Sequence, residues 1–132
     1  MLKVVLIALA LFGTQGAFQY TAAQAPQYTH NVGGSLSEGQ KVAKLLQYIR
    51  GLEGATFIRN NSEYDPKKAA SHLESKWQKH GEKVKTAEGF ILKLASASSS
   101  GTPYSIRFAD GKTVTTREAL LRELRRLDGN TP

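Results

Sequence analysis

The sequence predicts a small α+β domain, in which about four helices cover one face of an antiparallel sheet of two or three strands. Apolar residues recur at helical spacing in four segments. Short runs rich in β-branched and aromatic residues lie between these segments. The predicted order is helix, strand, helix, helix, strand, strand, helix (α-β-α-α-β-β-α), and it fills residues 37–129 as a single compact domain.

The first predicted helix covers residues 37–52, where Ser37 can serve as the N-cap. Its apolar face holds Val42, Leu45, Leu46, Ile49 and Leu52. Residues 55–59 are rich in β-forming residues and predict a strand, and the run Asn60-Asn61-Ser62 then predicts a turn.

The second and third helices have clear start signals. Asp65-Pro66 combines an aspartate N-cap with a proline at the first helical position. Thr86 caps the third helix. The second continues to a stop at Gly81, and its predicted apolar face holds Ala69, Ala70, Leu73 and Trp77. The third helix ends in Ser98-Ser99-Ser100-Gly101, because consecutive serines compete for backbone hydrogen bonds and glycine frees φ.

A hairpin and a last helix complete the domain. Apolar and polar residues alternate over 104–108, which indicates a half-buried strand, and Asp110-Gly111 indicates a tight turn. Residues 112–115 then return antiparallel. Thr115 and Glu118 have the spacing of a capping box that opens the last helix, and Asp128-Gly129 ends it.

The first 23 residues are predicted to be a secretory signal peptide, followed by a flexible leader over 24–36. Lys3 precedes an apolar run over 4–12, which is too short for the roughly 20 residues that a membrane-spanning helix needs. Cleavage after Ala23 is favoured over cleavage after Ala25, since a cut after Ala25 would leave Pro26 as the first residue. Thr14-Gln15-Gly16 is a third candidate cleavage site. We therefore expect a periplasmic protein with no stable membrane insertion.

Composition limits the chemistry. The chain has no cysteine, so disulfides, thiolate metal sites and cysteine nucleophiles are excluded. Its net charge is +7, or +6 once Lys3 is removed with the leader. For an exported protein this charge favours an envelope protein or an anionic envelope component as partner over nucleic acid, although a mixed basic surface that only aids solubility is the simpler interpretation.

No constellation indicates a cofactor, a metal or an established catalytic motif. His72 and His80 lie eight residues apart, which does not match the i, i+4 spacing of a helical two-histidine site. A hydrolase that pairs His72 with a serine of the segment 96–100 stays as one alternative. The basic residues of the last helix alternate with Glu118 and Glu123, as on an ordinary solvated face.

Several stretches taken in order resemble the YfeK-like family, a group of small exported proteins of Gram-negative bacteria without an assigned activity. They are Phe57-Ile58-Arg59-Asn60, Ser62-Glu63-Tyr64, Ala70-Ser71-His72-Leu73, residues 84–91, Ala95-Ser96, Ser98-Ser99-Ser100-Gly101, Pro103-Tyr104 and Ile106. The resemblance implies a periplasmic location and no known cofactor. It also implies a functional surface made of polar residues that packing does not require: Arg59, Asn60, Glu63, His72, Ser98, Ser99 and Tyr104.

These observations favour a non-catalytic binding or interaction module of the cell envelope. A second alternative is an inhibitor of a cell-wall hydrolase. Ser100-Gly101-Thr102-Pro103-Tyr104 fits the Ser-Gly-x-x-Tyr pattern of periplasmic lysozyme inhibitors, but those inhibitors are β-barrels, whereas this chain is mostly helical.

Overall fold

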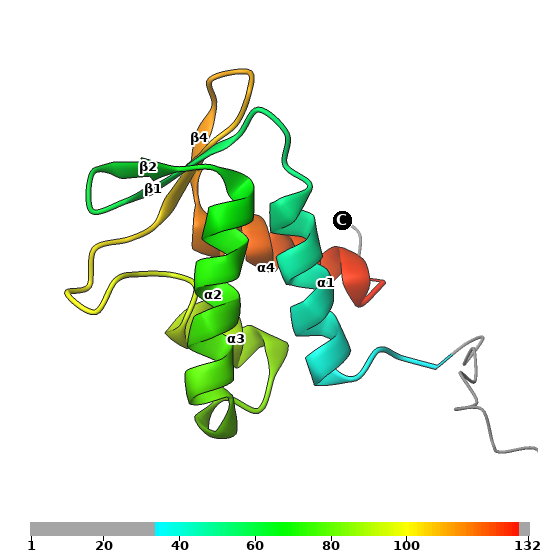
Figure 1. Ribbon diagram of the computed structural model, residues 1–132. Helices are drawn as coiled ribbons and strands as arrows, with labels where there is room; N and C mark the ends of the chain where they lie inside the picture. Colours follow the sequence, from blue (N-terminus) through cyan, green and yellow to red (C-terminus); the bar gives the residue numbers. More distant parts are fainter. Residues whose placement is uncertain (1–33, 130–132) are drawn as a thin grey trace, which may run out of the picture. The chain divides into compact units, whose positions relative to one another are not determined.

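The computed structural model describes residues 34–129, so the predicted signal peptide and most of the predicted leader lie outside the described residues. Within residues 34–129 the chain forms four α-helices, a short 3-10 helix and four strands, which confirms the predicted α+β class (Figure 1). In chain order these are α1 (Glu38–Arg50), β1 (Thr56–Arg59), β2 (Ser62–Tyr64), α2 (Pro66–His80), η2 (Gly81–Lys83), α3 (Ala87–Lys93), β3 (Ser105–Arg107), β4 (Thr113–Thr115) and α4 (Thr116–Leu127).

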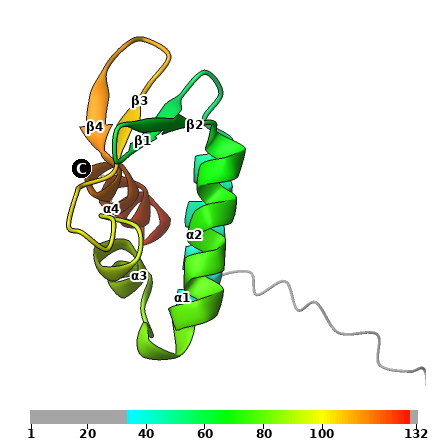
Figure 2. The ribbon, with the colours of Figure 1, turned by 60° about the vertical axis from the view of Figure 1, so that its left-hand side comes forward.

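The four strands form one antiparallel sheet in the order β2-β1-β3-β4. Phe57 of β1 lies opposite Tyr64 of β2 on one side and opposite Ile106 of β3 on the other. Residues that lie opposite each other share a face of the sheet. Phe57 and Ile106 are buried, so this face packs on the helices, which lie on one side of the sheet (Figures 1 and 2).

The sheet has four strands where two or three were expected, because β2 was taken as part of a turn. Asn60 and Asn61 have φ angles of 50° and 66°. Two positive φ angles in a two-residue loop are what a type I′ hairpin turn requires, and asparagine tolerates them well. All three residues of β2 are exposed, so the strand lacks the apolar alternation that identifies a half-buried strand.

The helices begin where their predicted caps lie. The Ser37 hydroxyl accepts a hydrogen bond from the Gln40 N–H, and the Gln40 side chain accepts one from the Ser37 N–H. The Asp65, Thr86 and Thr115 side chains each accept from the backbone N–H three residues later. The Glu118 carboxylate, predicted to complete a box with Thr115, instead accepts from Arg122 at 3.3 Å, as an i, i+4 pair on the solvated face of α4.

One hydrophobic core joins the helices to the sheet. The largest of its fully buried apolar side chains come from α1, α3, α4 and β3, and they are Phe90, Leu45, Leu46, Ile49, Ile91, Ile106 and Leu120. Trp77 of α2 contacts Phe90 edge to face, with ring centroids 6.3 Å apart.

A charged network fixes the start of α1 against two other helices. The Glu38 carboxylate accepts a hydrogen bond from the Ala87 N–H at 2.7 Å, which ties α1 to the start of α3. The same carboxylate pairs with Lys41, and the Lys41 ammonium also lies 2.8 Å from Asp128, just after α4. These contacts connect three segments that are distant in the sequence.

Candidate functional site

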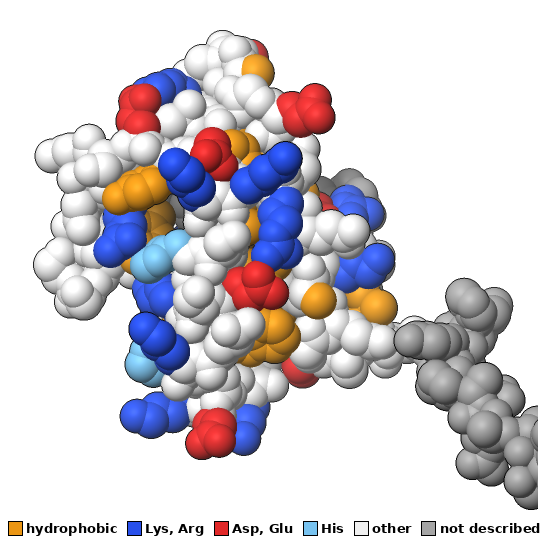
Figure 3. Space-filling model, in the orientation of Figure 1, with side chains coloured by type: hydrophobic (Ala, Val, Ile, Leu, Met, Phe, Trp, Pro, Cys, Tyr) orange, Lys and Arg blue, Asp and Glu red, His pale blue; other side chains and the backbone are white. Residues whose placement is uncertain are grey.

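A cavity of about 190 Å³ lies between the β1–β2 hairpin and α2. Ten residues line it: Phe57, Ile58, Arg59, Tyr64, Lys68, Ala69, His72, Leu73, Tyr104 and Thr116. Most of the wall is apolar or aromatic. On the surface, a hollow beside α2 is bordered by hydrophobic, basic and histidine side chains (Figure 3). We call this cavity the β1–α2 pocket.

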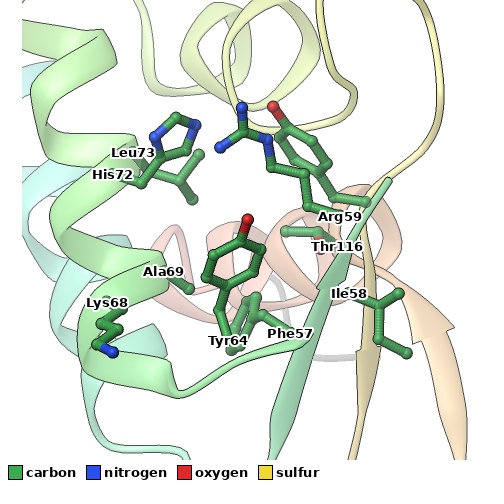
Figure 4. A pocket seen from close by; sticks show the side chains of 10 residues that line it. Phe57, Ile58, Arg59, Tyr64, Lys68, Ala69, His72, Leu73 and Thr116 are labelled. Atoms are coloured by element: carbon green, nitrogen blue, oxygen red, sulfur yellow. The ribbon is translucent and has the colours of Figure 1, made fainter. Parts of the chain in front are cut away.

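The alternation of β1 explains why Arg59 enters the pocket. Side chains two residues apart on a strand share a face, so Arg59 lies on the same face as the buried Phe57. Ile58 between them points away from the other labelled side chains, whereas the Arg59 guanidinium points toward His72 (Figure 4). Arg59 is half-buried, and it makes no ion pair within residues 34–129.

The opposite wall comes from α2. Because Asp65-Pro66 starts the helix directly after β2, the first turns of α2 lie beside the hairpin. Ala69, His72 and Leu73 have i, i+3, i+4 spacing and therefore share one helix face. Leu73 is buried and His72 is half-buried, so this face presents an imidazole at the edge of an apolar wall.

Three residues that line the pocket each hold a buried polar atom with no hydrogen-bond partner within the described residues. The atoms are Arg59 Nε, His72 Nε2 and Thr116 Oγ1. They are the complete set of such side-chain atoms among residues 34–129, and all three residues line the same cavity. Thr116, the first residue of α4, is fully buried. The unpartnered groups therefore gather in one place.

Tyr104 adds a hydroxyl beside them. The ring is buried, and the Lys76 ammonium lies 5.3 Å from its centroid. Lys76 donates to the Leu94 carbonyl at 2.6 Å and to the Tyr104 hydroxyl at 3.4 Å. An ammonium can only donate, so the Tyr104 oxygen is the acceptor and its own proton remains available to a ligand.

The pocket is positively charged. Arg59 and Lys68 are among its lining residues, and none of those ten residues is an aspartate or a glutamate. Burial lowers the pKa of His72, and the charges of Arg59, Lys76 and Lys79 lower it further. Near neutral pH the His72 imidazole is therefore neutral and surrounded by cations.

Comparison with known proteins identifies the family of the chain. Residues 36–128, most of the chain, match a family of unknown function, DUF5329. The chain belongs to this family. It is also 35% identical over 68 residues to the uncharacterized protein YfeK of Salmonella typhimurium, an alignment that covers 51% of this chain and 57% of that protein. The predicted resemblance to a YfeK-like family is therefore confirmed. No solved structure matches the chain.

Of the seven polar residues that the family resemblance implied, three line the β1–α2 pocket: Arg59, His72 and Tyr104. Asn60 lies in the β1–β2 turn, where its positive φ gives it a backbone role. Glu63 is on the other face of the sheet, paired with Arg107 at 2.7 Å. The implied surface is thus divided by the sheet.

Ser98 and Ser99 lie in the loop between α3 and β3. The Ser98 hydroxyl accepts from the Thr102 N–H and lies 2.8 Å from the Ser100 hydroxyl, and Ser99 is exposed. The Ser96 hydroxyl donates to the Ile91 carbonyl. Among the described residues, no serine of the segment 96–100 is hydrogen-bonded to His72, so the serine-histidine alternative gains no support from the geometry.

The geometry does not support the hydrolase-inhibitor alternative based on the Ser-Gly-x-x-Tyr segment either. Its Tyr104 is buried against Lys76, whereas an inhibitory loop must present its side chains to the cleft of an enzyme.

Within residues 34–129, no three histidine, aspartate or glutamate side chains are grouped closely enough to hold a metal ion. Over the same range, no helix has both the length and the apolar character needed to cross a membrane.

Sequence reasoning missed Tyr64, Ala69 and Thr116 as pocket residues. The pairing of Tyr64 with Phe57 depends on β2, which was not expected. Ala69 was assigned to the apolar face of the second helix. Its placement there was sound, and its small side chain leaves room for the cavity. For Thr116 no local pattern marks a buried hydroxyl, because its environment comes from β1 and α2.

Proposed function

We propose that this member of the DUF5329 family is a non-catalytic periplasmic protein that binds a small ligand in the β1–α2 pocket. The observation that carries the proposal is that three residues lining one cavity with apolar walls, Arg59, His72 and Thr116, each hold a buried polar atom without a hydrogen-bond partner in the described residues. Apolar walls with a few convergent polar groups are characteristic of small-molecule sites.

A buried polar group without a partner costs about 1–3 kcal/mol, so a fold with three of them in one place carries a considerable penalty. A ligand that supplies acceptors and donors there would remove the penalty on binding. Ordered water is the competing occupant, since a cavity of 190 Å³ is large enough for several molecules.

The periplasmic part of the proposal is supported by the apolar run after Lys3 and the small residues before Gln24. Fractionation of cells that produce the full chain, followed by amino-terminal sequencing, tests it. We expect the protein in the periplasmic fraction with Gln24 as its first residue. Full-length protein in the cytosol would contradict export. An anionic envelope component as partner remains a prediction that rests on net charge.

Binding is tested with the purified protein by ligand-detected NMR against small neutral, cationic and anionic aromatic molecules. Ala69→Phe places a ring in the pocket and should abolish the binding that the wild type shows. Ser71→Phe is the matched control, because it places the same ring on the exposed side of α2. Circular dichroism shows whether both variants are folded.

Two outcomes would contradict the proposal. The first is that no molecule binds the wild type, which would leave water as the occupant. The second is equal binding by the wild type and by folded Ala69→Phe, which would place the ligand elsewhere.

A further inference from the structure

We infer that the ligand of the β1–α2 pocket is a small carboxylate whose apolar body is about the size of one aromatic ring. The inference rests on the proposed binding function and specifies its ligand class. It is carried by the size of the cavity, the composition of its walls and the hydrogen-bonding geometry of Arg59.

The cavity sets the size of the ligand. A protein cavity of about 150 Å³ lined by apolar side chains holds benzene. The β1–α2 pocket, at about 190 Å³, has room for a ring and one further group of a few atoms. Phe57, Tyr64 and Leu73 provide apolar and aromatic surface that such a ring can contact.

Arg59 determines the charge of the group that the ligand carries beside its ring. Four other arginines in the described residues have carboxylate partners: Arg50, Arg107, Arg122 and Arg126. Two more, Arg117 and Arg125, are exposed to solvent. Arg59 alone among them is half-buried without a carboxylate partner. A desolvated guanidinium gains most from an anion, and no lining residue supplies one.

The shape of the guanidinium favours a carboxylate. Nε and one terminal nitrogen form a planar pair of donors that matches the two oxygens of a carboxylate. Arg59 Nε is buried and has no hydrogen-bond partner within the described residues, and the guanidinium points toward His72 (Figure 4). Thr116 and Tyr104, which line the same cavity, each carry a hydroxyl that can donate a hydrogen bond.

A phosphate head fits the same walls less well. A phosphate dianion needs a second buried cation, and Lys76 already donates to the Leu94 carbonyl and the Tyr104 hydroxyl. The Lys68 ammonium points away from the other labelled side chains (Figure 4). One half-buried guanidinium therefore balances a single negative charge.

The test compares four probes of nearly equal size by calorimetric titration of the wild-type protein: benzoate, benzamide, benzylammonium and phenyl phosphate. Benzamide keeps the ring and the planar head of benzoate but lacks its charge. We expect benzoate to bind at least tenfold more tightly than benzamide, as the loss of a hydrogen bond to a charged group implies, and benzylammonium not to bind.

Two arginines of neighbouring strands give a matched pair of variants. Arg59→Met should weaken benzoate binding by about tenfold to a hundredfold. Arg107→Met, on the other face of the sheet and paired with Glu63, should leave it unchanged within about twofold. Arg59→Lys keeps the charge without the planar donor pair and should restore only part of the affinity.

The results separate the two proposals. If benzamide or benzylammonium binds as tightly as benzoate and Ala69→Phe abolishes that binding, the pocket is a binding site but the ligand is not an anion. Tighter binding of phenyl phosphate than of benzoate would contradict the inference that the ligand carries a carboxylate. Equal losses in Arg59→Met and Arg107→Met would show that only overall charge matters. If no probe binds, both proposals fail.

Discussion

At the scale of single residues, His72 has surroundings that change its titration. Its imidazole is half-buried, its Nε2 has no partner within the described residues, and its pKa is lowered by burial and by the charges of Arg59, Lys76 and Lys79. Over the pH range between this lowered value and the ordinary value of 6.5, the unfolded chain binds a proton that the folded chain does not. The free energy of unfolding therefore decreases as the pH falls through that range.

We predict that His72→Gln removes this pH dependence. The stability advantage of the wild type over the variant should shrink as the pH falls from about 7.5 to about 5, because only the wild type has to protonate a disfavoured imidazole. Urea denaturation at several pH values measures the difference. His80→Gln, at the exposed end of α2, is the control and should retain the pH dependence of the wild type. A wild-type advantage that stays constant or grows with acidity would contradict the account.

Residue patterns could predict part of the candidate site. Arg59 lies two residues after Phe57 on a predicted strand, so its position on the inner face could have been derived from the alternation alone. His72 adjoins the predicted apolar face of α2. The pairing of Glu63 with Arg107 and the burial of Thr116 could not be predicted, because both depend on the strand register and the helix packing.

At the scale of elements, local chemistry accounts for most boundaries. Ser37, Asp65, Thr86 and Thr115 each cap the helix that was expected to follow them. The exception is β2, where three exposed residues carry no hydrophobic signal. The pair Asn60-Asn61 was a usable sign of the hairpin, because asparagine accepts the positive φ angles of a type I′ turn.

We predict that Asp65→Ala lowers the free energy of unfolding by about 1 kcal/mol, the usual cost of losing an N-cap. The Asp65 carboxylate accepts a hydrogen bond from the Lys68 N–H at 2.9 Å, and the side chain is exposed, so little packing is lost. Asp65→Asn should stay within a few tenths of a kcal/mol of the wild type, because asparagine caps equally well. Chemical denaturation measures both variants. Equal losses in both would show that charge, and not capping, is responsible.

At the scale of the whole molecule, packing between distant segments produces contacts that no local sequence pattern predicts. The start of α1 illustrates this: the hydrogen bond from the Ala87 N–H and the contact with Lys41 lower the pKa of Glu38. A lowered carboxylate pKa stabilises the fold above the ordinary value of 4.5, and this contribution is lost as the pH falls through the folded-state value.

Glu38→Gln should therefore destabilise the protein at neutral pH, by at most about 1 kcal/mol because the pair is partly exposed. The difference from the wild type should shrink below pH 4.5. Thermal or urea unfolding at pH 7 and at about pH 3.5 measures it. Glu53→Gln, which changes an exposed carboxylate with no ion pair within residues 34–129, is the control. A Glu38→Gln effect that is the same at both pH values would contradict the linkage.

The β1–α2 pocket also belongs to this scale. Its polar groups come from β1, α2, the residue before β3 and the first residue of α4, and only the folded sheet brings them to one cavity. The competing interpretation of the positive charge is a solvated basic surface, which the exposed arginines of α4 represent. The two interpretations assign a bound anion to different places on the molecule.

The most direct test is an NMR titration of the isotope-labelled protein with benzoate that maps the perturbed resonances. The account predicts saturable shifts that are largest at Phe57, Arg59, His72 and Tyr104. Weak, unsaturable shifts spread over Arg117, Arg122 and Arg125 of α4, with the pocket resonances unmoved, would contradict it.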